Sequence, residues 1–406
     1  MPARNEYTVG TGSVDITPSL DRPVYLAGFA PNRTALEVLH PLEVRALYVR
    51  DRYEGSVCLV VFDLIGFLNP SVERVRKRVR HLLAPERVII CSTHAHSVPD
   101  TLGLWGKAIL GIPYRSGVDK DYLARAEDAA VRAIEQAVAS ASPADLVAAK
   151  FQVPDGLVRN DRKGGGSYPM AFVLGVMREG KPVTALLNFA AHPEALWEKN
   201  RAVSPDYPGP FRHRMADAGI EALFFQGPLG AMLTPDVPRD SNVEARREFI
   251  ERMGARLAEL TRQALASAEP LIGPVRLAAR SMSVANLNRR FTFAGKVGFI
   301  DRPIDNGLIS TAMAFGCIGG LKFVTVPGEA SPEVGHELYE ACGKGLAMVL
   351  TLGLDELGYI IPAEFFNLKE YAYEKTMSIG PHAASTFVKI AYALRRECLA
   401  DEPRSA

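Results

Sequence analysis

A chain of 406 residues in which 48% are hydrophobic and 23% are charged has the composition of an ordinary soluble globular protein. Such a length can bury a large core, so neither disulfides nor a metal is needed merely to hold the fold together. The formal net charge of +1 offers no basic field to nucleic acid or to an anionic membrane, so we expect no nucleic-acid partner.

The cysteine content and the hydrophobic runs indicate the cellular compartment of the protein. The five cysteines contain no CxxC pair and are odd in number, which favours a reducing compartment and argues against a disulfide framework or a cysteine-based zinc site. The first residues lack the apolar core of a signal peptide, and no run of about 20 apolar residues would span a bilayer. We therefore predict a cytoplasmic protein without an integral membrane segment. The oligomeric state stays open, a homo-oligomer included.

Hydrophobic patterns predict alternating strands and helices along the chain. Strands over 43–50 and 56–67, a helix over 71–83 and a strand over 87–94 form a β-α-β unit, whose order favours a parallel pair. The next helix, over 119–140, is capped near Asp119 or Asp121. Further strands are predicted over residues 144–153, 170–179, 181–192, 221–227, 275–284, 321–329 and 347–354, and further helices over 208–219, 242–268, 332–342 and 382–398.

This order predicts an α/β protein in which mixed sheets are flanked by helices. We expect residues 1–406 to form one compact catalytic domain, in which two halves, about 1–160 and 161–400, are poorly separable. The glycine-rich stretch over 160–169 is the possible boundary, and a second, over 315–320, is predicted to be a loop. Neither matches GxxxxGK[ST], or GxGxxG after a strand, so a nucleotide-binding site is rejected.

Three predicted strands end in ionisable residues. His94 and His96 end one strand in THAHS, His192 ends another in NFAAHP, and Glu329 ends a third in VTVPGE. Sites in α/β sheets form where strands end and loops diverge. Two histidines and a glutamate are the ligand set of a catalytic zinc, with water completing the shell. Residues i and i+2 of an extended segment share a face, so His94 and His96 are expected to point into one cavity.

Each signal has a structural alternative. His94 and His96 could be a pair of hydrogen-bonded, half-buried histidines, and a histidine before proline, as at His192, is often structural. Glu329 could cap the helix that follows it, because carboxylates favour helix N-termini. The three strand ends together favour the metal site. The absence of GxSxG and HExxH argues against an α/β-hydrolase triad and a zincin.

Several segments together resemble the neutral/alkaline ceramidase family. The start GTGSVDITPSLDRPVYLAGF, THAHS, NFAAHP, VTVPGEASPEVG and LGLDELGYIIPAEFF with YAYE resemble that family's segments in the same order, over nearly the whole chain. The resemblance implies zinc ligands at His94, His192, Glu329 and Tyr359, a substrate-facing histidine at His96, a pocket-lining glycine at Gly28 and a substrate-contacting tyrosine at Tyr373.

The chain departs from the family at the substrate side of the site. Thr234, in QGPLGAMLTPD, stands where the family has a serine with an assigned nucleophilic role. In VRNDRKGG, either Arg159 or Arg162 must stand in for the family's arginine. We expect no C-terminal immunoglobulin-like domain of the kind that true ceramidases carry. The metal scaffold is expected to be kept while the substrate is changed.

These features predict a zinc-dependent hydrolase of amide (N-acyl) or related bonds in a small-molecule substrate, in which metal-activated water attacks a carbonyl. His96 would bind the oxyanion or move a proton, and Arg159 or Arg162 would stabilise negative charge. Thr234 is a candidate nucleophile or water-orienting group. Asp63, assigned to the pocket with Gly28, either orients a histidine or caps the next turn.

Two other functions remain open at this stage. One is a metal-dependent enzyme of another class, a lyase or a carbohydrate-directed enzyme, because fold and metal do not fix the reaction. The other is a binding protein that has lost catalysis, which the missing serine segment motivates.

Overall fold

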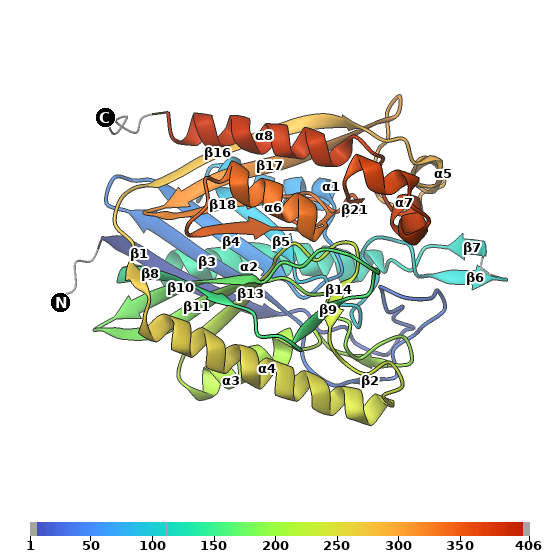
Figure 1. The fold of residues 1–406 in the computed structure, drawn as a ribbon, viewed down its shortest axis with the longest axis horizontal. Coiled ribbons are helices and arrows are strands. Elements are labelled where there is room, and N and C mark those ends of the chain that lie inside the picture. The colour runs from blue at the N-terminus through green and yellow to red at the C-terminus, as the bar shows by residue number, and fades with distance from the viewer. Residues whose placement is uncertain (1–5, 111, 401–406) are drawn as a thin grey trace.

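Helices cover two stacked β-sheets in the computed structural model, which describes residues 6–110 and 112–400 (Figure 1). The mixed α/β architecture predicted from the sequence is confirmed. The longer strands are β1 (Tyr7–Asp15), β3 (Glu43–Asp51), β4 (Ser56–Phe62), β5 (Val88–Ser92), β8 (Ser142–Gln152), β10 (Met170–Arg178), β11 (Lys181–Phe189), β13 (Glu221–Gln226), β16 (Val275–Ala285), β17 (Leu308–Ile318), β18 (Leu321–Thr325) and β20 (Ala347–Leu350).

Shorter strands and the helices complete the fold. The shorter strands are β2 (Glu37–Val38), β6 (Lys107–Ile109), β7 (Ile112–Arg115), β9 (Val158–Asn160), β12 (Ala202–Val203), β14 (Leu233–Pro235), β15 (Glu269–Pro270), β19 (Glu329–Ala330) and β21 (Tyr359–Ile360). The helices are α1 (Asn69–Arg78), α2 (Lys120–Ala139), α3 (Pro208–Asp217), α4 (Val243–Ala266), α5 (Arg289–Lys296), α6 (Pro332–Ala341), α7 (Ala372–Thr376) and α8 (Ala383–Cys398), with short 3-10 turns at 85–87, 363–367 and 369–371.

The larger sheet has the strand order β13-β11-β10-β8-β1-β3-β4-β5, with β15 paired to β8. Strands β4 and β5 are parallel and joined through α1, so the predicted β-α-β unit is confirmed. Strand β8 pairs with both β1 and β10, so the sheet is continuous across the stretch that the sequence suggested as a boundary. Helix α2 begins at the predicted cap, where the Asp119 side chain accepts hydrogen bonds from the backbone of Asp121 and Tyr122.

The smaller sheet has the order β16-β17-β18-β20. Its central strand β17 corrects the prediction of a glycine-rich loop over 315–320, because residues 315–318 are strand and only Gly319 and Gly320 turn the chain into β18. Glycine at position 316 allows close packing rather than a turn, since a Cβ there would lie 2.2 Å from the Phe323 ring. Glycine in a strand often marks such a close approach.

Alternating side chains of β17 divide the interior into layers. Ala312 and Ala314 face the larger sheet, whereas Met313 and Phe315 face helices α6 and α8. On the opposite face of the larger sheet, Phe211 of α3 and residues of α4 pack on strands β11 and β13. Figure 1 shows α8 on one side of the molecule and α3 and α4 on the other. Both sheets are therefore packed against each other on one face and covered by helices on the other.

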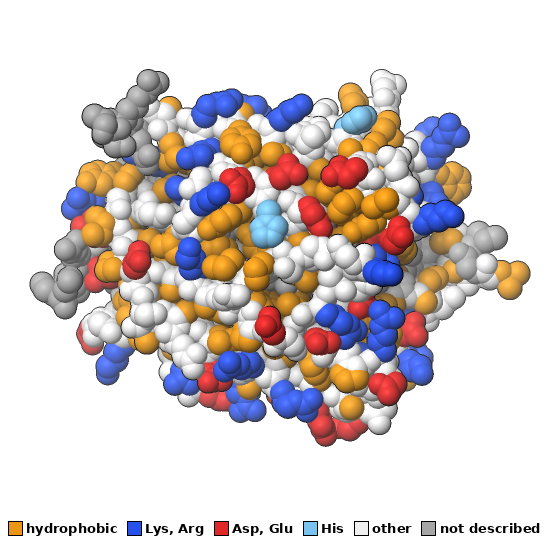
Figure 2. Space-filling view, in the orientation of Figure 1, with side chains coloured by type: hydrophobic (Ala, Val, Ile, Leu, Met, Phe, Trp, Pro, Cys, Tyr) orange, Lys and Arg blue, Asp and Glu red, His pale blue; other side chains and the backbone are white. Residues whose placement is uncertain are grey.

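The surface mixes charges of both signs. Figure 2 shows basic and acidic side chains interspersed over one face, with hydrophobic side chains between them. Among the residues the structure describes, no helix is long and apolar enough to cross a membrane. The expected absence of a nucleic-acid partner stays a prediction.

Candidate metal centre

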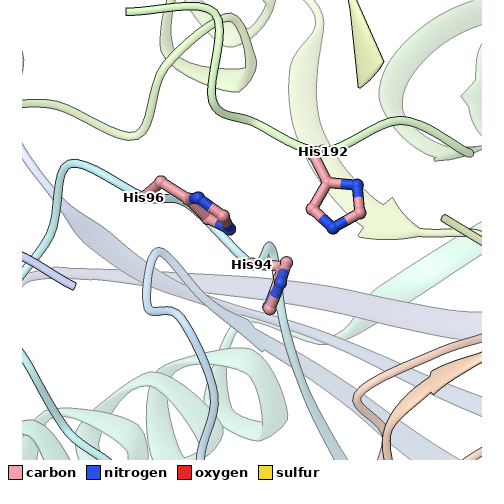
Figure 3. A group of neighbouring side chains, drawn as sticks. All are labelled: His94, His96 and His192. Atoms are coloured by element: carbon pink, nitrogen blue, oxygen red, sulfur yellow. The ribbon is translucent and has the colours of Figure 1, made fainter. Parts of the chain in front are cut away.

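Three buried histidines converge where strands of the larger sheet end. His94 and His96 follow β5, and His192 follows β11 (Figure 3). One ring nitrogen from each lies within 4.8 Å of the others. The ring centroids of His94 and His96 are 5.0 Å apart, and those of His94 and His192 are 5.3 Å apart. Two of the three strand ends named from the sequence therefore supply neighbouring side chains.

The backbone brings His94 and His96 together in a way that the sequence did not indicate. His94 has φ of 65°, in the left-handed region, so the segment is not the extended strand that was predicted. The His94 backbone N–H donates to Leu64 and that of His96 donates to Pro193, which fixes the turn between them. A non-glycine residue held in this region costs free energy and is often found at functional sites.

Two of the histidines are oriented through their Nδ1 atoms. His94 Nδ1 donates to the carbonyl of Ile65 at 2.6 Å, and His192 Nδ1 donates to the carbonyl of Leu233 at 2.8 Å. A carbonyl can only accept, so both Nδ1 atoms carry protons and both Nε2 atoms are left to face inward. Histidine ligands of metals are oriented by such second contacts in most metalloproteins.

Both Nε2 atoms meet the same carboxylate oxygen of Glu329. The distances to Glu329 Oε2 are 3.3 Å from His94 Nε2 and 3.2 Å from His192 Nε2. Ligand atoms about 2.0–2.1 Å from a tetrahedral zinc lie about 3.3–3.4 Å from one another, and both histidine–glutamate distances are close to this spacing. Burial opposes ionisation of Glu329, but His94 and His192 lower its pKa. Burial likewise opposes protonation of His192, but Glu194 and Glu329 raise its pKa.

Glu329 does not cap the following helix, and its carboxylate faces the histidines instead. The cap of α6 is Ser331, whose hydroxyl accepts from the Val334 backbone. Glu329 itself lies in β19, in parallel register with Tyr359 of β21. Tyr359 is 5% exposed, and burial together with the Glu329 carboxylate raises the pKa of its phenol. The fourth residue that the resemblance implied as a ligand is thus next to the third.

His96 faces the same space but has a different environment. Its Nδ1 lies 3.3 Å from Glu194 Oε2 without hydrogen-bond orientation, and neither of its ring nitrogens has a hydrogen-bond partner within the described residues. Burial, with the charges of the other two histidines, lowers its pKa well below 6.5. Gly28, with φ of 97°, packs on this ring: a Cβ at Gly28 would lie 2.3 Å from His96 Cγ.

The two candidate arginines occupy different places. Arg162 Nε donates to Glu374 Oε1 at 2.6 Å, and Glu374 is fully buried beside Tyr373. The Tyr373 ring lies 6.0 Å from that of Tyr359, so Arg162 belongs to the side of the site where these tyrosines lie. Arg159 instead pairs with Asp161 and Asp236. The structure places Arg162, rather than Arg159, near the tyrosines.

The remaining two predicted residues lie behind the site. Thr234 is 2% exposed in β14 and follows Leu233, whose carbonyl orients His192. Asp63 is 1% exposed, and its carboxylate accepts hydrogen bonds from Arg212 at 2.9 Å and 2.6 Å and from the Glu43 backbone at 2.9 Å. This corrects the prediction that Asp63 orients a histidine or contacts substrate: it anchors Arg212 beneath the sheet.

An apolar cavity opens beside the candidate metal centre. His94, His96, Glu329 and Tyr359 form one part of its wall, with Gly28 and Tyr373. Hydrophobic side chains form most of the rest, among them Ile65, Leu102, Trp105, Phe291, Ile300 and Leu357. Such a site, apolar with a few convergent polar groups, is the usual form of a small-molecule pocket.

Sequence reasoning missed two carboxyl groups of this region. Glu194 follows His192 by two residues and approaches His96, and Glu356 precedes Tyr359 by three residues and lines the cavity. Glu356 lies inside a segment that had already been identified and Glu194 directly follows one, so their proximity to candidate ligands was the available signal. An acidic residue in a loop is usually solvated, however, and only the tertiary structure shows that these two are buried.

Comparisons with known proteins bear on the fold. The sequence matches no protein-family description and no curated protein. The structure is similar to neutral ceramidase from Pseudomonas aeruginosa, with a TM-score of 0.79 at 18% identity over 97% of this chain and 75% of that one. It is also similar to a ceramidase complexed with C2, with a TM-score of 0.80 at 17% identity over 99% of this chain and 76% of that one. The chain has the fold of the neutral ceramidases, as its segments suggested.

Proposed function

We propose that this protein is a zinc-dependent hydrolase of amide (N-acyl) or related bonds in a small-molecule substrate. The observation that carries the proposal is the approach of two histidine Nε2 atoms, each with its Nδ1 tied to a carbonyl, to one oxygen of Glu329. The donor set and its spacing fit zinc, with His94, His192, Glu329 and Tyr359 as the residues that would hold it. The ceramidases of the same fold extend the proposal to acyl-amide bonds.

Bound zinc would lower the pKa of a coordinated water and polarise a carbonyl oxygen. The protein's own residues supply the rest of the chemistry. Burial lowers the pKa of His96 and favours its neutral form, which can donate a hydrogen bond to the oxyanion or accept one from water. Glu194, next to His96 Nδ1, would restrict the orientation of the ring.

Positive and hydroxyl groups near the tyrosines would complete the site. We assign Arg162 the stabilisation of developing negative charge, because Glu374 holds its guanidinium beside the tyrosines. Tyr373 lines the cavity and is half exposed, which suits contact with substrate. We assign Thr234 the orientation of water or substrate rather than nucleophilic attack, since no neighbouring base is bonded to it in the described contacts.

A second candidate is a metal-dependent enzyme of another class, directed at carbohydrate or another polyol. The observation that favours it is Glu356, a carboxyl group in the wall of an otherwise apolar cavity. Carboxyl groups commonly take part in reactions at sugar hydroxyls, whereas a plain alkyl chain needs none. Activity on sugar substrates but not on N-acyl substrates would select this function.

The first experiment measures metal content and activity together. Protein purified without added metal should contain about one zinc per chain, and it should hydrolyse members of an N-acyl amide panel. His94→Ala should lose both the metal and the activity. His213→Ala is the matched control, because His213 is an exposed histidine of α3, and it should keep both. Wild-type protein that neither contains zinc nor takes it up would contradict the hydrolase and leave a binding protein.

A further inference from the structure

The cavity beside the metal centre is small and mostly apolar. Its volume is about 60 Å³, less than half of the about 150 Å³ of a cavity that holds benzene, so it takes a substituent of only a few heavy atoms. The walls near Leu102, Trp105 and Ile300 would contact carbon atoms of a ligand. A group that enters this cavity from the metal centre is therefore short.

One wall of this cavity carries a carboxyl group with an unused oxygen. Glu356 is 7% exposed, and its Oε1 accepts a hydrogen bond from the Gly358 backbone at 2.8 Å. Its Oε2 is buried and has no hydrogen-bond partner within the described residues. Its backbone is fixed, because Arg302 donates to the Glu356 carbonyl at 3.3 Å while it also pairs with Asp355.

An unpaired buried carboxyl oxygen is costly for the folded protein. Leaving a buried polar group without a partner costs roughly 1–3 kcal/mol, so such groups are rare and often functional. The Gly358 hydrogen bond uses only Oε1, so it does not explain why the buried Oε2 has no partner. A ligand with a hydrogen-bonding group would supply the missing partner.

We propose that this cavity binds a short substrate substituent bearing a hydroxyl or carboxamide group, and that the Glu356 carboxyl recognises this group. The inference rests on the proposed function and narrows its substrate class to short, polar N-acyl compounds. A long unbranched alkyl chain would exceed the cavity volume and would leave Glu356 Oε2 without a partner.

The charges around the cavity favour an uncharged substituent on the substrate. A carboxylate or phosphate on the substrate would face the Glu329 carboxylate. An ammonium group would face the Arg302 guanidinium, which lines the same cavity. Burial, and next to it the charge of Glu329, raises the pKa of Glu356 well above 4.5, so a neutral carboxyl group can both donate to and accept from a hydroxyl.

The test compares two probes that differ in one group. Pentanohydroxamic acid and 4-hydroxybutanohydroxamic acid share a metal-binding hydroxamate and a chain of the same length, but one ends in methyl and the other in hydroxyl. Isothermal titration calorimetry on the zinc-loaded full chain should show that the hydroxyl probe binds about tenfold more tightly, or better. Glu356→Leu should reverse this preference, and Glu356→Gln should retain most of it.

The matched control is Glu333→Leu. Glu333 has the same contact pattern, with Oε1 accepting from the Gly166 backbone and a buried Oε2 that has no partner in the described part of the chain, but it does not line this cavity. Glu333→Leu should leave the probe preference unchanged. Equal binding of the two probes by the wild type, binding of neither, or a preference that survives in Glu356→Leu would overturn the inference.

A parallel assay separates this inference from the proposed function. The amides of the same two acids are offered as substrates. Hydrolysis of both without preference would keep the hydrolase and overturn the role of Glu356. Discrimination between the probes in calorimetry without hydrolysis of any amide would keep the role of Glu356 and overturn the hydrolase.

Discussion

Glu329 and Tyr359 are partners in the parallel register of β19 and β21, two strands of two residues each. The pairing is held by backbone hydrogen bonds from Glu329 to Gly358 and from Ser331 to Ile360, at 2.9 Å and 3.0 Å. A carboxylate and a phenol that lie 30 positions apart are thus fixed side by side against the histidines. This arrangement allows the contribution of the Tyr359 phenol to the candidate metal site to be tested separately from that of Glu329.

Tyr359→Phe removes only the phenolic hydroxyl from this pair. We expect the variant to fold, because the ring remains packed, and to keep bound zinc through the other three residues. We expect kcat/KM to fall by about 10²-fold, since a group at the reaction centre is lost. Steady-state kinetics and metal analysis check this. Tyr339→Phe, whose hydroxyl donates to Gly345 on the surface, is the control and should retain full activity.

Removal of the metal should lower thermal stability. The candidate ligands come from separate segments after β5 and β11 and at β19, so a bound ion cross-links parts of the fold that are far apart in sequence. A ligand present at 100 times its Kd stabilises the native state by about 2.7 kcal/mol. Chelation should therefore lower Tm by about 2–8 °C. The Tm of His192→Ala should not respond to chelator, and equal shifts in the two proteins would refute the site.

Arg162 and Arg159 should differ when each is replaced by glutamine. Arg162→Gln leaves the buried Glu374 carboxylate without its partner, which should lower the free energy of unfolding by about 1–3 kcal/mol. It should also lower kcat more than KM changes, if Arg162 stabilises charge in the transition state. Arg159→Gln breaks contacts at the rim and should change kcat by less than about twofold. Denaturant unfolding and steady-state kinetics on both variants measure these differences. Equal losses of kcat in the two variants would contradict the assignment of charge stabilisation to Arg162.

Asp63→Asn should act on stability and not on chemistry. Asp63 pairs with buried Arg212, and breaking one partner of a buried pair typically costs about 3–5 kcal/mol. Glu43 remains 3.3 Å from Arg212, so a loss of about 2–4 kcal/mol in the free energy of unfolding is expected. Asp128→Asn, which breaks the exposed pair with Arg78, is the control and should cost less than about 1 kcal/mol. A changed KM in a folded Asp63→Asn protein would show instead that Asp63 contributes to substrate binding.

The stability of the protein should decline with pH because of Glu356. Its folded-state pKa lies above that of the unfolded chain, so between these two values the native state binds more protons. Its stabilising contribution is therefore complete below about pH 4.5 and is lost as pH rises toward the raised pKa, at up to about 1.4 kcal/mol per unit. Glu356→Gln removes this slope. Urea unfolding of both proteins between about pH 5 and pH 8 measures it, and identical slopes would show that Glu356 is ionised normally.

Local patterns predicted much of the fold and several of the side chains that lie together at the candidate site. Hydrophobic runs and caps predicted β4, α1, β5 and α2 because such elements form from neighbouring residues. The segments THAHS, NFAAHP and VTVPGE indicated His94, His192 and Glu329, since a histidine or acid that ends a buried strand is unusual. Strand β17 was missed because the glycines at its end are typical of a loop, whereas Gly316 is needed there by a ring from the neighbouring strand.

Local patterning showed which residue types come at the ends of the strands, and hence that a zinc site was worth expecting. Which groups face one another depends on the tertiary fold: Asp63 with Arg212, Arg162 with Glu374, and His96 with Glu194. These pairs join residues 98 to 212 positions apart, as with the 149 positions between Asp63 and Arg212 and the 212 between Arg162 and Glu374. Local periodicity carries no information about such separations, because burial and pairing arise only when the sheets stack and water is excluded between them.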